Sequence, residues 1–400
     1  MRAALPMLLV LLLVSGCANL LDLEERKVLD GGALPGCADY CAQADMVCPG
    51  LFYKNVEGCN GVCSAYAPGD PAMPTGNTLA CRNKALMNAK LYNSEAQTFC
   101  PGAGPSGAAP QMENSCGSLC EGYCDLYKSV CGEIPDCKNK CLLLPDRPTV
   151  GTAQTDFESG ADTVQCRLAH VTAAATAKYV RDPDAQATHC GHSNLKSNVL
   201  CDVNDTKVEG LEIQCADFCK LTMGACQGPN QVYETPQQCQ AVCTKLTAGK
   251  LNELSLMTDS RRCRRENAYL ALVETDPLKL ALQCSDASPI PGHCGEGRCA
   301  AYCRLAQQGC GAQFKTTFPG ATPQDEFKTC ESRCLELPDK GQNVLYSVAS
   351  ASARGSPLNC RAQRVARALA ALNMDMAIPA GTCEAALGLP APGGLPTECQ

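Results

Sequence analysis

The sequence has no tryptophan, only 4% aromatic residues and four histidines in 400 residues. With so few large side chains, a small domain buries too little apolar area to offset its chain entropy by packing alone. Few histidines leave few general bases, and no G-x-S-x-G elbow, phosphate-binding glycine loop, H-E-x-x-H, C-x-x-C or C-x-x-C-H motif occurs. These absences argue against the common hydrolase, nucleotide-binding, redox and haem classes. We expect no enzyme activity and no cofactor.

The amino terminus carries a short apolar run that ends at a cysteine. A run of this length is typical of a secretory signal and is too short for a membrane span. Ser15 and Gly16 directly before Cys17 resemble a bacterial lipobox. We therefore interpret residues 1–16 as a lipoprotein signal peptide, Cys17 as the lipidated residue and 17–36 as its tether. An ordinary signal peptide that happens to precede a cysteine is the alternative.

The residues that follow indicate where the chain resides. Ala18 stands where aspartate favours retention in the inner membrane of enteric bacteria, so we expect a lipid anchor in the outer membrane. The protein could face either the periplasm or the cell surface. Removing residues 1–16 removes one basic residue, Arg2, and leaves 33 basic against 41 acidic residues, a formal net charge of −8. An acidic chain without a basic cluster disfavours nucleic acid as a partner.

The other 32 cysteines fall into four consecutive sets of eight. In every set the first three cysteines are spaced C-x3-C-x6-C, and the fourth and fifth are spaced C-x3-C. Recurrence of two fixed spacings indicates an internal repeat. We interpret the sets as four domains, repeats 1 to 4, at residues 37–116, 120–201, 215–294 and 299–399.

The fixed spacings are helical, because cysteines at i, i+4 and i+11 share one helix face at about 100° per residue. Residues 168–179 and 362–372, after the sixth cysteine, have the composition of good helix formers. We predict a mainly α fold of four tandem, small, disulfide-stapled helical repeats, each with about three helices, in an elongated array. Thirteen residues separate repeats 2 and 3 but only three or four separate the other neighbours, which predicts two stiff pairs joined at 202–214.

Two other positions recur with the cysteines. The residue before the second cysteine is aromatic in each repeat (Tyr40, Tyr123, Phe218, Tyr302). The residue after the sixth cysteine is always arginine (Arg82, Arg167, Arg264, Arg361). Such an arginine could bind an anion, but we expect it to pair with a carboxylate or to donate to carbonyls within its own repeat.

The two C-x3-C pairs resemble the helical hairpin of the small mitochondrial intermembrane-space chaperones. That resemblance covers the hairpin alone and implies no shared function. It implies that the two outer cysteines of the hairpin pair with each other and that the two inner cysteines do the same. In repeat 1 this gives Cys37–Cys63 and Cys41–Cys59. Our hypothesis completes the set with Cys48–Cys81 and Cys100–Cys116, one of 105 possible pairings of eight cysteines.

A second resemblance covers nearly all of the chain after Cys17. The segments 76–82 (GNTLACR), 166–170 (CRLAH) and 189–192 (HCGH) resemble tandem cysteine-rich repeats in lipoproteins of myxobacteria. Repeats 3 and 4 keep the cysteines but depart from this signature before their sixth cysteine. The resemblance implies a surface or periplasmic lipoprotein and no catalytic activity.

Three of the four histidines, His170, His189 and His192, belong to repeat 2 and with Cys190 suggest a zinc or haem site. Repeats 1, 3 and 4 have other residues at the equivalents of His170 and His189, and Cys190 is needed to complete its set of eight. We therefore expect ordinary polar or surface histidines and no metal. Asp202 to Asp205 resemble a fragment of a calcium loop but lack its glycine and terminal glutamate, so we expect a solvated linker.

Three functions from different classes follow from these observations. The first is a non-catalytic, lipid-anchored cell-envelope protein that acts as a surface binding or structural module, with a protein or glycan partner bound by its variable loops. The second is a metal-binding protein or enzyme centred on the histidines of repeat 2. The third is an inhibitor-like secreted module, for which stapled loops are well suited.

Overall fold

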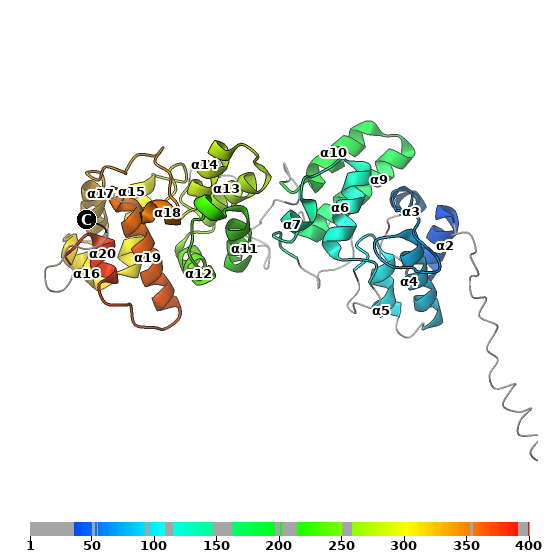
Figure 1. Ribbon diagram of the computed structural model, residues 1–400, viewed down its shortest axis with the longest axis horizontal. Coiled ribbons are helices and arrows are strands. Elements are labelled where there is room, and N and C mark those ends of the chain that lie inside the picture. Colours follow the sequence, from blue (N-terminus) through cyan, green and yellow to red (C-terminus); the bar gives the residue numbers. More distant parts are fainter. Residues whose placement is uncertain are drawn as a thin grey trace, which may run out of the picture.

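The structure is a computed structural model, and it describes residues 36–49, 53, 55–92, 96–108, 115–146, 162–196, 201, 214–249, 258–352, 355–390 and 399. The expected signal peptide, Cys17 with its tether to residue 35, and the linker at 202–213 lie outside the described residues. The described residues form a mainly helical fold without a β-strand, as predicted. The four repeats follow one another along the long axis of the molecule (Figure 1).

Each repeat contains four helices that carry cysteines, one more than predicted. Repeat 1 has α2 (Cys37–Val47), α3 (Val56–Cys63), α4 (Leu79–Leu91) and α5 (Ala96–Ala103). Repeat 2 has α6 (Leu119–Val130), α7 (Cys137–Cys141), α9 (Val164–Val180) and α10 (Pro183–Ser193). Repeat 3 has α11 (Cys215–Ala225), α12 (Pro236–Lys245), α13 (Arg261–Val273) and α14 (Pro277–Asp286), with a short 3-10 turn η3 (Gly228–Asn230). The fourth helix carries the seventh cysteine.

Repeat 4 has the same four helices, α15 (Arg298–Gly309), α17 (Pro323–Cys334), α19 (Pro357–Asn373) and α20 (Thr382–Leu387). Among the described residues, repeat 4 also has two short helices, α16 (Gly311–Thr317) and α18 (Val348–Ala351), that the described parts of the other repeats do not contain. The additions fall between the third and fourth cysteines and between the fifth and sixth, the two segments whose lengths vary among the repeats. Length variation is thus absorbed outside the shared helices.

The same pairing order recurs in all four sets of cysteines. The first pairs with the fifth, the second with the fourth, the third with the seventh and the sixth with the eighth, which accounts for 16 disulfides within repeats. The expected Cys37–Cys63 and Cys41–Cys59 pairs are present. The expected Cys48–Cys81 and Cys100–Cys116 pairs are wrong, because the structure joins Cys48 to Cys100 and Cys81 to Cys116. The unpredicted fourth helix explains the error, since it folds back on the third helix and brings the seventh cysteine to the end of the first.

The recurring aromatic residues lie at the centre of each repeat. Tyr40, Tyr123, Phe218 and Tyr302 are at most 1% exposed. The three tyrosine hydroxyls donate to the carbonyl three residues after the seventh cysteine: Tyr40 to Ala103 at 2.5 Å, Tyr123 to Ser193 at 2.7 Å and Tyr302 to Ala386 at 2.6 Å. Phe218 has no hydroxyl, and the equivalent carbonyl of Ala287 accepts from Tyr233 at 3.4 Å instead. The three bonds from Tyr40, Tyr123 and Tyr302 tie the first helix to the fourth, whereas Tyr233 ties the segment after the third cysteine to the end of the fourth helix.

In three repeats the recurring arginine bonds to groups within its own repeat, as expected. Arg82, Arg167 and Arg264 are fully buried, and each donates to backbone carbonyls after the fourth helix and at the start of its own helix. Each also contacts the residue five positions earlier: Asn77 at 2.5 Å, Asp162 at 2.8 Å and Asp259 at 2.5 Å. Buried guanidinium groups need such partners because an unpaired buried charge is very costly.

Repeat 4 departs from this pattern. Ser356 stands at the position of Asn77, Asp162 and Asp259, and Arg361 is only partly buried. A Cβ atom at Gly388, whose φ is +70°, would meet the guanidinium of Arg361, so this glycine allows the arginine to lie against the backbone after α20. The arginine therefore still reaches the end of the fourth helix, but without the carboxylate partner seen in repeats 2 and 3.

Neighbouring repeats pack in two different ways. In repeats 1 and 2, α3 lies against α9, and in repeats 3 and 4 the equivalent α12 lies against α19. The crossing of α3 and α9 is close, since a Cβ atom at Gly61 would stand 2.6 Å from the carbonyl oxygen of Ala175. Both pairs of repeats share a second contact. Asn77 donates to Asp125 at 2.9 Å in the first pair, and Arg304 donates to Asp259 at 2.5 Å in the second. The contacts are equivalent because Asp125 and Arg304 each stand five residues after the first cysteine of their repeat.

Repeats 2 and 3 meet through another set of residues. Asp162 pairs with Arg265 and accepts from the hydroxyl of Tyr269 at 2.7 Å, so it contacts α13 rather than the first helix of the next repeat. The side chain of Leu143 also lies against Gly224. This junction is the place where the sequence predicts a joint, although residues 202–213 themselves lie outside the described part of the chain. In the part of the chain that the structure describes, no helix is long and apolar enough to cross a membrane.

Candidate metal centre

The antiparallel helices α9 and α10 of repeat 2 place three histidines at one point. Thr163 caps α9 by accepting from the amide of Cys166, and His170 follows Cys166 by one turn. Asp182 caps α10 by accepting from the amide of Ala185, with proline at the first helical position. His189 and His192 lie three residues apart on α10 and so share a face of that helix.

The three imidazoles face one another. The Nδ1 atoms of His170 and His189 lie 3.2 Å apart. The ring centroids are 5.4 Å apart for His170 and His189, 5.0 Å for His170 and His192, and 6.1 Å for His189 and His192. One nitrogen from each ring can be chosen so that all three lie within 4.8 Å of one another. Three of the chain's four histidines therefore form a single cluster.

Burial differs across the cluster. His170 is fully buried, whereas His189 and His192 are half-buried and lie on the solvent side. Burial, with the neighbouring His192 and His189, lowers the pKa of His170 to about 3. Burial and His192 also lower the pKa of His189, and the carboxylate of Asp182 opposes that shift. At neutral pH, His170 and His189 are therefore neutral imidazoles, the form that binds metals.

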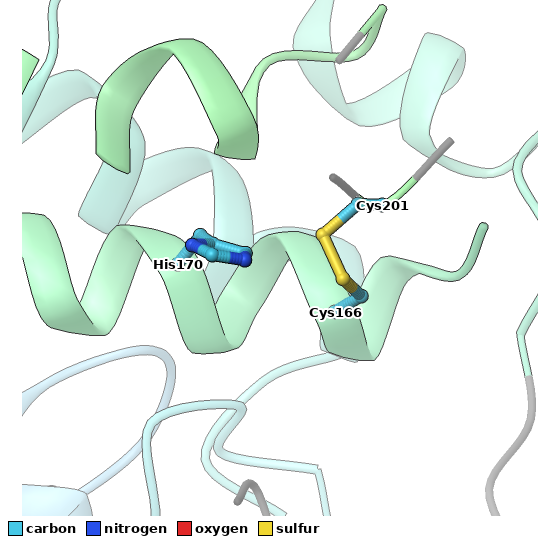
Figure 2. Close-up of side chains that lie close together, drawn as sticks. All are labelled: Cys166, His170 and Cys201. Carbon is cyan, nitrogen blue, oxygen red and sulfur yellow. A yellow bond between two sulfur atoms is a disulfide. The ribbon is translucent and has the colours of Figure 1, made fainter. Parts of the chain in front are cut away.

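The sulfur atoms near the cluster are not available as ligands. Figure 2 shows His170 beside the disulfide of Cys166 and Cys201, whose sulfur atoms lie within 4.8 Å of its ring nitrogen. Cys190, which the sequence places between the α10 histidines, is joined to Cys131. A zinc or haem site that uses Cys190 is therefore excluded in this oxidised structure, and the possible donors are nitrogens.

The same location in the other repeats holds different side chains. The equivalents of His170 are Ala85, Asn267 and Arg364, and those of His189 are Phe99, Gln283 and Thr382. In repeat 3, the Asn267 amide donates to the carbonyl of Cys263 at 3.0 Å, within its own helix. The frame of each repeat, meaning its four cysteine-bearing helices and four disulfides, therefore forms without histidines at these positions.

The remaining sequence candidates are placed as follows. His170 is buried and so is not a surface histidine, while the expectation of ordinary polar histidines without a metal stays a prediction. The fourth histidine, His293, lies in repeat 3 with its Nδ1 atom 2.8 Å from the carboxylate of Asp286. Arg82, Arg167 and Arg264 are occupied by carbonyls and side chains of their own repeats and form no anion site. The segment from Asp202 to Asp205 lies outside the described residues.

A small cavity lies at the junction of repeats 1 and 2. Its volume is about 240 Å³, and its lining includes Tyr66, Asn77, Asp125 and Lys128. Small-molecule sites typically occupy about 300–1,000 Å³, so this cavity is small for a substrate site. The histidine cluster is the stronger candidate for chemistry.

Comparison with known proteins gives no relative. No protein-family model, curated protein or solved structure matches this chain.

Proposed function

We propose that the chain is a non-catalytic, lipid-anchored protein of the cell envelope that acts as a surface binding or structural module. The observation that supports this proposal best is the recurrence of one disulfide order in four consecutive repeats, with segments between the third and fourth and between the fifth and sixth cysteines that vary in length. A fixed frame with variable insertions is typical of proteins that present a surface rather than a cleft.

The location is part of the proposal. The lipobox-like segment before Cys17 supports a lipid anchor, and Ala18 supports attachment to the outer membrane. Sixteen disulfides within repeats agree with an oxidising compartment. Membership of the cysteine-rich repeat lipoproteins of myxobacteria stays a prediction from the sequence.

The partner is proposed to be a protein or a glycan rather than nucleic acid, because the chain is acidic. The loops after the fifth cysteine offer surface for such a partner. Residues 67–70 in repeat 1 and 340–343 in repeat 4 are exposed, and the Met73 side chain is 70% exposed. Exposed loops on a crosslinked frame lose little entropy when they bind.

The anchor is tested by changing Cys17 to serine and fractionating the cells. We expect the natural chain in the membrane fraction and the Cys17→Ser chain in the soluble fraction. Recovery of the natural chain in the soluble fraction would contradict the lipid anchor.

The binding role is tested with the lipid-free chain and isolated envelopes of the producing cells. We expect retention on the envelopes to fall at least tenfold when residues 70–75 and 340–343 are replaced by Gly-Ser sequences of equal length. The control changes two exposed lysines of α4, Lys84 and Lys90, to serine and should retain binding. Unchanged retention in the loop variants would argue against the loops as the binding surface.

A further inference from the structure

We propose that His170, His189 and His192 form a binding site for a divalent first-row transition-metal cation in repeat 2, held by three imidazole nitrogens. This site goes beyond the structural and binding role of the four repeats, and it would be specific to one of them. The sequence suggests a metal site at these histidines, although the other three repeats have no histidine at the equivalents of His170 and His189.

The spacing of the nitrogens fits such a cation. A zinc ion binds histidine nitrogens at about 2.0–2.1 Å in tetrahedral geometry, so two of its nitrogen ligands stand about 3.4 Å apart. The Nδ1 atoms of His170 and His189 are 3.2 Å apart, close to that separation. With one nitrogen taken from each ring, all three nitrogens, including that of His192, lie within 4.8 Å of one another, and rotation of the half-buried His192 ring can bring them closer.

The chemistry of the donor set selects the class of cation. Imidazole nitrogen suits Zn²⁺, Cu²⁺, Ni²⁺ and Co²⁺, whereas Ca²⁺ and Mg²⁺ require oxygen ligands. The Nδ1 atom of His192 is buried and has no hydrogen-bond partner among the described residues. The carboxylate of Asp182 acts electrostatically on His189 and would favour a cation there. Three protein nitrogens leave a fourth position for water.

The site is held in place before any metal arrives. Cys166 crosslinks the start of α9 to Cys201, and Cys190 crosslinks α10 to Cys131. These two disulfides flank the three histidines and fix the helices that carry them. Both histidines of α10 are half-buried, so the cluster lies near the surface of the repeat.

The test uses the full mature chain with its disulfides intact, because reduced cysteines bind zinc wherever they lie. After treatment with a chelator, the chain is titrated with Co²⁺, whose visible absorption reports nitrogen coordination, and then with Zn²⁺ in competition. We expect one Co²⁺ per chain, displaced by one Zn²⁺.

Single variants decide whether the cluster is responsible. His189→Ala and His192→Ala should each weaken Co²⁺ binding at least tenfold, and both should fold because these side chains are half-buried; an unchanged circular dichroism spectrum and the absence of free thiols check this. The matched control is His293→Ala, which removes the one histidine outside the cluster and should leave Co²⁺ binding unchanged. Failure to bind one equivalent, or equal binding by the natural chain and both cluster variants, would overturn the proposal.

Discussion

Repeats 2 and 3 share one frame but differ in what fills it. Both have the same disulfide order, the same buried arginine after the sixth cysteine and an aspartate five residues before that arginine. Between their third and fourth helices, however, repeat 2 has His170 and His189 where repeat 3 has Asn267 and Gln283. The comparison teaches that the shared helices and disulfides do not depend on the side chains between these two helices. Residues at these positions can therefore differ between repeats and serve a function.

The same comparison shows how the frame compensates for a lost group. In repeat 2 the carbonyl of Ser193 accepts from Tyr123, whereas in repeat 3 the first helix offers only Phe218. Tyr233, from the segment between the third and fourth cysteines, donates to the equivalent carbonyl of Ala287. A buried carbonyl needs a donor, and a different part of the chain supplies it.

The buried arginines should give the largest effect. Arg167→Met and Arg264→Met each leave several buried carbonyls without their charged donor. Each also removes one of the two arginines at a buried aspartate, since Arg265 stays at Asp162 and Arg304 at Asp259, so each should cost about 3–5 kcal/mol of unfolding free energy. Denaturant unfolding with the disulfides intact measures this loss. The control is Lys128→Met, which removes a 65% exposed side chain from an exposed ion pair with Glu133 and should cost about 1 kcal/mol or less. A loss in only one of the two repeats would break the equivalence of their frames.

Removing the disulfide between the sixth and eighth cysteines should give the next effect. The crosslinks Cys166–Cys201 and Cys263–Cys294 close segments with sequence separations of 35 and 31, so replacing either pair with alanine should cost about 2–4 kcal/mol. The two costs should agree because the separations are similar. Thermal unfolding of both variants checks this, and a variant as stable as the natural chain would contradict a structural role for that crosslink.

Much of this frame could be predicted from the sequence, because fixed cysteine spacings imply helix faces. The first two disulfides of repeat 1 and the internal role of Arg82, Arg167 and Arg264 were predicted correctly. The fourth helix was not predicted, and the pairings of Cys48, Cys81, Cys100 and Cys116 were therefore wrong. A usable signal was present, since Asp182 before Pro183 and Asp276 before Pro277 are typical helix starts.

The histidine cluster depends on that same missed helix. The sequence indicates all three residues as candidates, but the residues meet only because α10 lies antiparallel to α9, which residue spacing does not specify. In the sequence, the absence of histidines from the other repeats argues against a site. The structure shows why that argument is weak, because positions between the third and fourth helices vary without disturbing the disulfides.

The tyrosine contacts should give a smaller effect. Tyr123→Phe and Tyr233→Phe each leave a buried carbonyl without its donor, so each should cost about 1–2 kcal/mol. Phe218→Tyr, added to Tyr233→Phe, should recover part of the loss by restoring the donor that the other repeats use. Denaturant unfolding measures all three, and no recovery in the double variant would contradict the equivalence of Phe218 and Tyr123.

Near neutral pH, between about pH 7 and 6, the smallest effect expected is a local pH dependence of repeat 2 in the metal-free chain. The pKa of His170 is about 3 in the folded protein, below its ordinary value of 6.5, so folding of this region is favoured above pH 6.5 and loses stability as the pH falls toward 3. Amide hydrogen exchange in α9 and α10 should therefore quicken as the pH is lowered, after correction for intrinsic rates. The equivalent helices of repeat 3, with Asn267 in place of His170, serve as the control, and an equal change in both would contradict the assignment to His170.

Mapping the disulfides in the unreduced chain by proteolysis and mass spectrometry tests the central claim most directly. The account predicts one order in every repeat, with Cys131–Cys190 and Cys166–Cys201 in repeat 2 matched by Cys226–Cys284 and Cys263–Cys294 in repeat 3. Pairing of the third cysteine with the sixth, or different orders in the two repeats, would contradict a shared frame.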